Sequence, residues 1–236
     1  MFSLFKSATK RWLGKRFSVY KIPNHNLFGG LLSERAAFRI VDVGANNGGF
    51  TTKLMEVFDI QVAAVVFVEP DPRCMPSLES LRDSFSRSGV KAEIIASAVD
   101  KDDMPKELFV TGDAAHNSLL RPVEFAFQEV EVPCRTGEQI LSSTASLFES
   151  DGPTLLKVDV QGKELDVLLS FGVGLAFFDY IVCEYTFEGF YEISTSFSSL
   201  MALLEPEFDL VSILSQVYDL QGRLQYCNLL LKRRSC

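Results

Sequence analysis

The sequence predicts an α/β fold in which helices cover both faces of a mostly parallel sheet. Short apolar runs alternate with helical patterns along the chain, which is typical of parallel strands joined by crossover helices. The first run leads into a glycine-bearing turn at 44–49, and the second ends in the acidic Glu69-Pro70-Asp71. Strand, glycine turn, helix, strand and acid in this order are the general arrangement of a nucleotide-type binding site.

The expected elements follow from these patterns in chain order. Apolar runs predict parallel strands at 38–43, 63–68, 92–98, 154–160 and 179–184. Helical patterns fill the intervals at 49–58, 74–87, 137–148 and 162–171. Two further strands, at 107–111 and 128–134, are expected to form an insertion beside the sheet. A helix at 197–204 and an antiparallel edge pair at 208–214 and 224–232 complete a seven-stranded sheet.

Composition indicates one main domain at 34–236, because 236 residues with 47% apolar and 23% charged side chains are ordinary for a globular protein. No apolar stretch approaches the ~20 residues that span a bilayer, and the first thirty residues lack a signal-like apolar segment. A soluble, cytoplasmic protein is therefore expected.

The first 33 residues form a separate basic segment. They hold six Lys or Arg and no acid, so the rest of the chain carries about −14 of charge against −8 for the whole. Aromatic and aliphatic side chains from Phe2 to Phe17 recur near one helical face, which predicts an amphipathic N-terminal helical arm. Such an arm is expected to pack over the main domain as a lid or dimer contact, with a membrane surface as the alternative. Nucleic acid is not expected as a partner, because the acidic body repels phosphates. The oligomeric state stays open.

Ligands of open α/β sheets bind where the carboxyl ends of the strands meet. The residues expected there are Asp42, Glu69, Ser97, Ala98, Asp159 and Glu184. Four of these six are carboxylates.

The turn also lacks the Gly-x-Gly-x-x-Gly pattern of dinucleotide sites, since Asn46 replaces the second glycine, and Asp42 would repel a pyrophosphate. S-adenosylmethionine, which carries a sulfonium and an amino group and no phosphate, suits an acidic turn better.

Five motifs together resemble the FkbM family of S-adenosylmethionine-dependent methyltransferases. They are Val41-Asp-Val-Gly-Ala-Asn-Asn-Gly48, Phe67-Val-Glu-Pro-Asp71, Asn117-Ser-Leu119, Leu156-Lys-Val-Asp-Val-Gln-Gly-Lys-Glu-Leu165 and Ile181-Val-Cys-Glu184. The resemblance covers residues 36–232 and departs from the family pattern at Ser170-Phe-Gly172. It implies a class I methyltransferase fold, which is Rossmann-like, and O-methylation of a small-molecule, sugar, glycan or natural-product acceptor.

Seven residues are candidate cofactor contacts. They are Asp42, Gly44, Asn46, Gly48, Glu69, Ser97 and Ala98. Glu69 is expected on the ribose hydroxyls, and Ser97 and Ala98 along the adenine edge. The alternatives are a strand cap with a tight turn for Asp42 and Gly44, a helix cap for Asn46 and an exposed loop acid for Glu69.

Asp159, Glu184 and His116 are the candidate catalytic residues. Asp159 ends the fourth parallel strand, Glu184 ends the fifth, and His116 lies in the polar loop beside Asn117. The aromatic stretch after Glu184, with Phe187, Phe190 and Tyr191, is expected to wall a substrate pocket. The simpler explanations are an exposed loop histidine and an aromatic stretch that only packs on the sheet. Glu164 is explained by the dipole of the following helix. Strand-end acids could also hold a divalent metal ion, which is not favoured.

Two other functions remain open on the sequence. A catalytically silent interaction module would keep the fold and bind a partner through the basic arm. An NAD-linked oxidoreductase on a similar sheet is the less favoured alternative, because the glycine pattern is incomplete.

Overall fold

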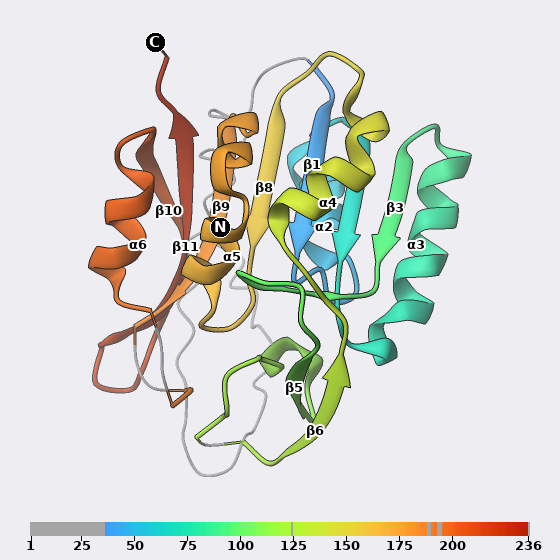
Figure 1. Cartoon of the computed structure of the whole chain (residues 1–236). Helices are drawn as coiled ribbons and strands as arrows, with labels where there is room; N and C mark the ends of the chain where they lie inside the picture. The colour runs from blue at the N-terminus through green and yellow to red at the C-terminus, as the bar shows by residue number, and fades with distance from the viewer. Residues whose placement is uncertain (1–35, 124, 188–189, 193–194, 236) are drawn as a thin grey trace, which may run out of the picture.

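The computed structural model describes residues 36–235 except 124, 188–189 and 193–194, so the predicted N-terminal arm lies outside the described residues. Its centre is a seven-stranded sheet in the order β10-β11-β9-β8-β1-β2-β3 (Figure 1). The strands are β1 (Phe38–Val43), β2 (Val62–Val68), β3 (Lys91–Ile95), β8 (Thr154–Val158), β9 (Tyr180–Thr186), β10 (Phe208–Tyr218) and β11 (Leu224–Arg233). This confirms the predicted class I methyltransferase-like α/β fold.

Five strands run parallel, and the chain reverses only at one edge. β1 pairs in parallel with β2 and β8, β2 with β3, and β8 with β9. β11 pairs antiparallel with both β9 and β10. The carboxyl ends of the five parallel strands therefore meet at one edge of the sheet, which is the lower edge in Figure 1.

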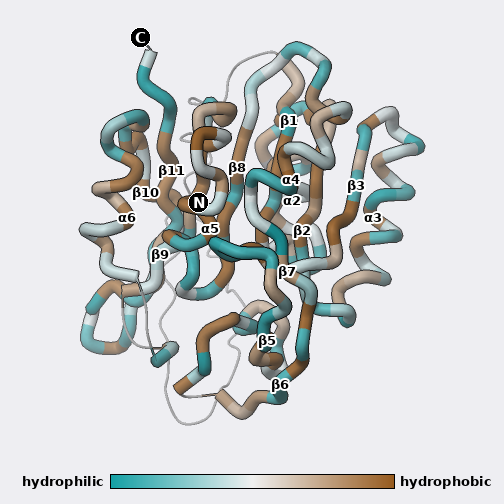
Figure 2. The backbone as a smooth tube through the Cα atoms, in the orientation of Figure 1, coloured by the Kyte–Doolittle hydropathy of each residue, from teal (hydrophilic) through white to brown (hydrophobic). Residues whose placement is uncertain are grey.

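Helices cover both faces of the sheet and create two apolar cores. α2 (Gly49–Phe58) and α3 (Met75–Arg87) place Leu54 and Leu78 in the core of one face. α4 (Gly137–Thr144), α5 (Glu164–Ser170) and α6 (Phe197–Leu204) pack on the other face, where α4 and α5 lie in front of the sheet in Figure 1. In Figure 2 α3 alternates between hydrophobic and hydrophilic stretches, as a helix with one buried face should.

The predicted insertion is a hairpin beyond the carboxyl edge of the sheet. β5 (Lys106–Thr111) pairs antiparallel with β6 (Phe127–Val132), and in Figure 1 both strands lie below the central strands. A short parallel pair, β4 (Ala98–Val99) and β7 (Cys134–Arg135), connects the hairpin to the body of the protein. The hairpin thereby covers the edge at which ligands of this fold bind.

Several boundaries differ from prediction for local reasons. The strand expected at 92–98 ends at Ile95, because the chain turns at Ser97, whose N–H donates to the Ile95 carbonyl. The strand expected at 128–134 divides at Pro133, which has no N–H for a ladder. The strand expected at 154–160 ends at Val158, and the helix expected from 162 begins at Glu164. In the described part of the chain, no helix is long and apolar enough to cross a membrane.

Candidate active site

A cavity at the carboxyl edge collects most of the predicted site residues. Its lining comes from the ends of β1, β2, β3, β8 and β9, from β11 and from the loop before β6. Eight of the ten predicted residues lie in its wall: Gly44, Asn46, Glu69, Ser97, Ala98, His116, Asp159 and Glu184. Asp42 and Gly48 do not, so direct contact of these two with a cofactor stays a prediction.

Both predicted glycines of the turn after β1 have left-handed backbones and close neighbours. Gly44 has φ 71°, and a Cβ there would lie 1.9 Å from the Asp159 carbonyl oxygen. Gly48 has φ 75°, and a Cβ there would lie 2.3 Å from Leu81 Cδ2. Packing of the turn on its neighbours therefore requires glycine at both positions.

Asp42 lies beneath the turn and forms a buried ion pair. Its Oδ1 lies 3.2 Å from Lys157 Nζ, and its Oδ2 accepts from the Thr51 hydroxyl at 2.9 Å. Burial lowers the pKa of Lys157, but Asp42 and Asp159 outweigh burial and raise that pKa to about 12. Lys157 also donates to the carbonyl of Gly44. The charge of Asp42 thus fixes the turn from below, because a buried ion pair is costly to break.

Glu69 holds the same turn from the side of β2. One carboxylate oxygen accepts the Asn46 N–H at 2.7 Å, and the other accepts the Asp71 N–H at 2.9 Å. Burial raises the pKa of Glu69, against the effect of these two N–H groups. Each carboxylate oxygen has a second lone pair. Glu69 can therefore accept ligand hydroxyls while it orders the turn.

Among the described residues of the wall, Ser97 is the one whose buried side-chain oxygen lacks a hydrogen-bond partner. Its side chain is only 2% exposed, and its Oγ has no hydrogen-bond partner. A buried hydroxyl without a partner costs roughly 1–3 kcal/mol. Ser97 follows β3 and lines the cavity with Ala98, so a ligand in the cavity would supply the missing partner.

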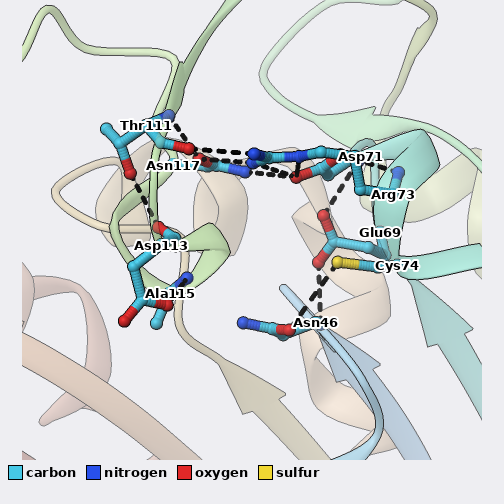
Figure 3. Close-up of polar contacts among 9 residues, drawn as sticks. All are labelled: Asn46, Glu69, Asp71, Arg73, Cys74, Thr111, Asp113, Ala115 and Asn117. Carbon is cyan, nitrogen blue, oxygen red and sulfur yellow. Dashed lines mark hydrogen bonds and ion pairs between the residues drawn. The ribbon is translucent and has the colours of Figure 1, made fainter. Parts of the chain in front are cut away.

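A polar network ties the loop before β6 to the end of β2 (Figure 3). The Arg73 guanidinium pairs with Asp71 at 2.7 Å and donates to the Thr111 carbonyl at 3.0 Å. Asn117 donates to Asp71 at 2.6 Å and accepts the Thr111 N–H at 2.8 Å. Although burial opposes it, the Arg73 side chain holds the pKa of Asp71 below its usual value. The network fixes the loop that closes the cavity.

Asp159 and Glu184 meet across the end of the cavity. The Gln161 amide nitrogen donates to Asp159 Oδ1 at 2.8 Å and to Glu184 Oε1 at 2.9 Å. Asp159 Oδ2 lies 3.6 Å from Lys157 Nζ. Desolvation raises the pKa of Glu184 well above its usual value, and the nearby charges of Asp159 and Glu164 raise it further. Burial and the neighbouring negative charges therefore disfavour the charged form of Glu184.

His116 belongs to an aromatic row beside the cavity. Its ring stacks on Phe125 with centroids 4.8 Å apart, and Phe125 lies 6.3 Å from Phe190 in a stacked arrangement. His116 and Phe190 both line the cavity. The backbone oxygen of His116 lies 3.2 Å from the hydroxyl oxygen of Tyr191. The row gives one wall of the cavity a flat apolar surface.

Glu164 is buried and closes the turn between β8 and α5. Its carboxylate accepts the Gly162 N–H at 2.9 Å and the Val160 N–H at 3.3 Å. Burial raises the pKa of Glu164 to about 7, against these two N–H groups. The explanation of Glu164 by the helix dipole alone was therefore incomplete, because its main contacts are with the turn.

Carboxylates dominate the charge around the cavity. Glu69, Asp159 and Glu184 lie in its wall, whereas the wall lysine, Lys163, is paired with Asp100 at 3.2 Å and with Asp166. Within the described ranges, no group of three or more His, Cys, Asp or Glu side chains is arranged to hold a metal ion.

Sequence reasoning missed Gln161 and Lys157. Lys157 carried a usable signal, because a lysine within the otherwise apolar run Leu155-Leu-Lys-Val requires a carboxylate partner. Gln161 carried none, because its role arises only when the turn after β8 meets Glu184 and Tyr191. Of the aromatic stretch expected to wall a pocket, Phe190 and Tyr191 do line the cavity.

Comparisons with known proteins agree with this geometry. The family described as the Methyltransferase FkbM domain matches residues 42–214. The structure resembles a methyltransferase FkbM from Methylobacillus flagellatus KT at 16% identity and a TM-score of 0.52, covering 82% of this chain and 43% of that one. The chain thus spans less than half the length of that relative. No curated protein matches the sequence.

Two further solved structures are similar to this chain at lower TM-scores. A putative tRNA (m1A22) methyltransferase of Streptococcus pneumoniae, in complex with S-adenosyl-L-methionine, has 11% identity and a TM-score of 0.46, with 92% of this chain and 75% of that one covered. TrmK of M. capricolum, in complex with S-adenosyl-homocysteine, has 9% identity and a TM-score of 0.47, with 92% and 70% covered.

Proposed function

The chain belongs to the FkbM methyltransferase family, and we propose that it uses S-adenosylmethionine to methylate a hydroxyl of an uncharged small molecule, a sugar or natural product among them. The observation that carries the proposal is the buried Ser97 Oγ without a partner in the same cavity as Glu69. The two residues fit the cofactor, since Glu69 suits ribose hydroxyls and Ser97 suits the adenine edge.

The cofactor supplies a methyl group on a cationic sulfonium. The carboxylates of the wall favour this positive charge, and they oppose the pyrophosphate of a dinucleotide. The same charges oppose a phosphate or carboxylate on the acceptor, which supports an uncharged acceptor and disfavours nucleic acid. The loop held by Asn117 and the wall of Tyr191 and Phe190 enclose part of the cavity, and with both ligands bound they would limit the access of water.

Asp159 is proposed to receive the proton of the acceptor hydroxyl. Its side chain is 29% exposed at the cavity wall, and its Oδ2 lies 3.6 Å from Lys157 Nζ. A correctly positioned general base typically raises the reaction rate by about 10²- to 10⁴-fold. His116 lines the cavity from the loop before β6. It is proposed to help place the acceptor and not to act as the base.

Calorimetric titration tests the cofactor assignment. S-adenosylmethionine and S-adenosylhomocysteine should bind with measurable heat, and NAD should not. A panel of hydroxyl compounds, each paired with its phosphorylated analogue, then tests the acceptor by release of S-adenosylhomocysteine. Turnover of the hydroxyl compounds, without turnover of their phosphorylated analogues, supports the proposal. Binding without turnover of any member would favour the interaction module, and binding of NAD alone would overturn the methyltransferase assignment.

Asp159→Asn tests the base with the best acceptor of that panel. The change keeps the shape and removes the charge, so turnover should fall by about 10²- to 10⁴-fold with little change in cofactor affinity. His116→Ala should cost less. Normal turnover by a folded Asp159→Asn variant would refute the assignment, and activity restored by magnesium would favour a metal site instead.

A further inference from the structure

Gln161 occupies an unusual backbone position at the end of β8. It has φ 60°, which is a left-handed conformation rarely adopted by residues other than glycine, asparagine and aspartate. Such a conformation costs roughly 1–3 kcal/mol and persists only when the surroundings enforce it. Gly162 follows it with φ 106°. The contacts of Gln161 with its surroundings must therefore offset this strain.

Every polar group of the Gln161 side chain has a partner in a different segment. The amide nitrogen donates to Asp159 at 2.8 Å and to Glu184 at 2.9 Å, and the amide oxygen accepts from the Tyr191 hydroxyl at 3.1 Å. The backbone oxygen accepts from Ser118 Oγ at 2.8 Å. Exchange of the amide oxygen and nitrogen would place an acceptor against two carboxyls, so the network fixes the orientation of the amide.

This orientation decides which carboxyl oxygens can carry a proton. Asp159 Oδ1 and Glu184 Oε1 each accept an N–H of the same amide and so must be unprotonated. Asp159 Oδ2 faces Lys157 at 3.6 Å. Glu184 Oε2 has only the long contact of 3.5 Å with Asn228 Nδ2. The one remaining place for a shared proton is therefore Glu184 Oε2.

We propose that Gln161 is a positioning residue whose amide holds Asp159 Oδ1 and Glu184 Oε1 together as proton-free hydrogen-bond acceptors, which confines any proton of the pair to Glu184 Oε2 and leaves Asp159 free to receive the proton of the acceptor. This inference rests on the function proposed above in one respect only, namely that Asp159 receives the proton of the acceptor hydroxyl. The arrangement of the two carboxyls itself is independent of any ligand, and it is what the experiment measures.

Other charged and titratable groups also face Glu184. From the elements packed around it these are Lys157, Asp159, Glu164, Cys183, Tyr191, Tyr226 and Cys227. None of these seven groups is itself replaced when Gln161 alone is changed. A change in the titration of Glu184 then reports the loss of the amide donors, because a hydrogen bond to the charged form lowers the pKa of a carboxyl.

The experiment is a carbon-13 NMR titration of the full chain labelled at glutamate carboxyls, with Glu184 assigned by the signal missing from Glu184→Gln. Gln161→Met keeps the length of the side chain and removes both donors, so the Glu184 midpoint should rise by about 1 pH unit. Gln161→Glu replaces the donors by a third carboxyl and should raise the midpoint further. Gln128→Met, the same change at an exposed position of β6, should leave the midpoint where it is in the wild type.

Thermal unfolding and calorimetric titration with S-adenosylmethionine accompany each variant. Cooperative unfolding and cofactor affinity within threefold of the wild type, together with the raised midpoint, support the proposal. An unchanged Glu184 midpoint in either folded variant would overturn it, and failure of both variants to unfold cooperatively would assign Gln161 to the fold of the turn instead. A wild-type chain that binds no S-adenosylmethionine would defeat the proposed function, yet its titration would still decide the role of Gln161.

Discussion

At the scale of single residues, the same side chains order the turn after β1 and present polar groups to the cavity. Glu69 accepts two backbone N–H groups and still faces the cavity, and Asp42 and Lys157 support the turn from beneath. Asp42 was predicted from its position at a strand end, but the strand end alone does not say toward which side the carboxylate points. Its full burial places it under the turn.

Glu69→Ala should weaken the binding of S-adenosylmethionine by about 10- to 100-fold, or roughly 1.5–3 kcal/mol. The change removes a charged acceptor for the ribose and frees the N–H groups of Asn46 and Asp71. Calorimetric titration measures the affinity. Glu129→Ala, an exposed glutamate of β6, is the matched control and should bind as the wild type does. Equal affinity in both variants would contradict the assignment of Glu69.

Glu164 should make the protein less stable as the pH rises. Its folded pKa of about 7 lies above the ordinary 4.5, so the stability that its protonated form contributes is complete below about pH 4.5 and is lost as the pH rises through about 7. The loss is on the order of 3 kcal/mol. Glu164→Gln keeps an oxygen for the Gly162 and Val160 N–H groups and carries no charge.

Denaturant unfolding between pH 5 and 8 measures this effect. The free energy of unfolding should decline less steeply in Glu164→Gln than in the wild type, whereas Glu149→Gln, an exposed change, should follow the wild type. If the free energy of unfolding of Glu164→Gln declined as steeply as that of the wild type, the pH dependence would have to come from Glu69 and Glu184, whose pKa values burial also raises.

At the scale of elements, periodicity predicted nearly every strand and helix, and the errors lie where a side chain overrides it. α5 begins two residues late because the carboxylate of Glu164 caps the N–H of Gly162, and β6 stops because Pro133 cannot donate. The short pair of β4 and β7 was not predicted, since two residues carry no periodicity. The position of the β5–β6 hairpin over the cavity also depends on contacts between segments distant in sequence.

Arg73 should hold this insertion in place. Arg73→Ala removes the partner of the buried Asp71 and the donor to the Thr111 carbonyl, and so loosens the loop that Asn117 anchors. Hydrogen exchange of the Thr111 amide, which donates to Asn117 Oδ1, should accelerate by about tenfold. Arg82→Ala removes an equally exposed arginine that pairs only with its neighbour Asp83, and it should leave this exchange unchanged. Equal rates in the two variants would disprove the anchoring role.

At the scale of the whole molecule, the fold and the cavity are built within the described part of the chain. The two main cores extend from Phe38 to Leu231, and the described lining of the cavity from Val43 to Tyr226. The basic arm predicted at 1–33 lies outside the described residues. Its role therefore remains a prediction from charge and periodicity: an acid-free segment is attracted to an acidic body.

Removal of residues 1–20 should leave the affinity for S-adenosylmethionine within about threefold and the unfolding cooperative, because the cavity and both cores remain. If the arm shapes access to the cavity, turnover or affinity for the acceptor should fall by more than the cofactor affinity does. Parallel calorimetry and release of S-adenosylhomocysteine separate the two effects. Unchanged kinetics with loss of attachment to anionic vesicles would favour the membrane role, and loss of cofactor binding would make the arm part of the cofactor site.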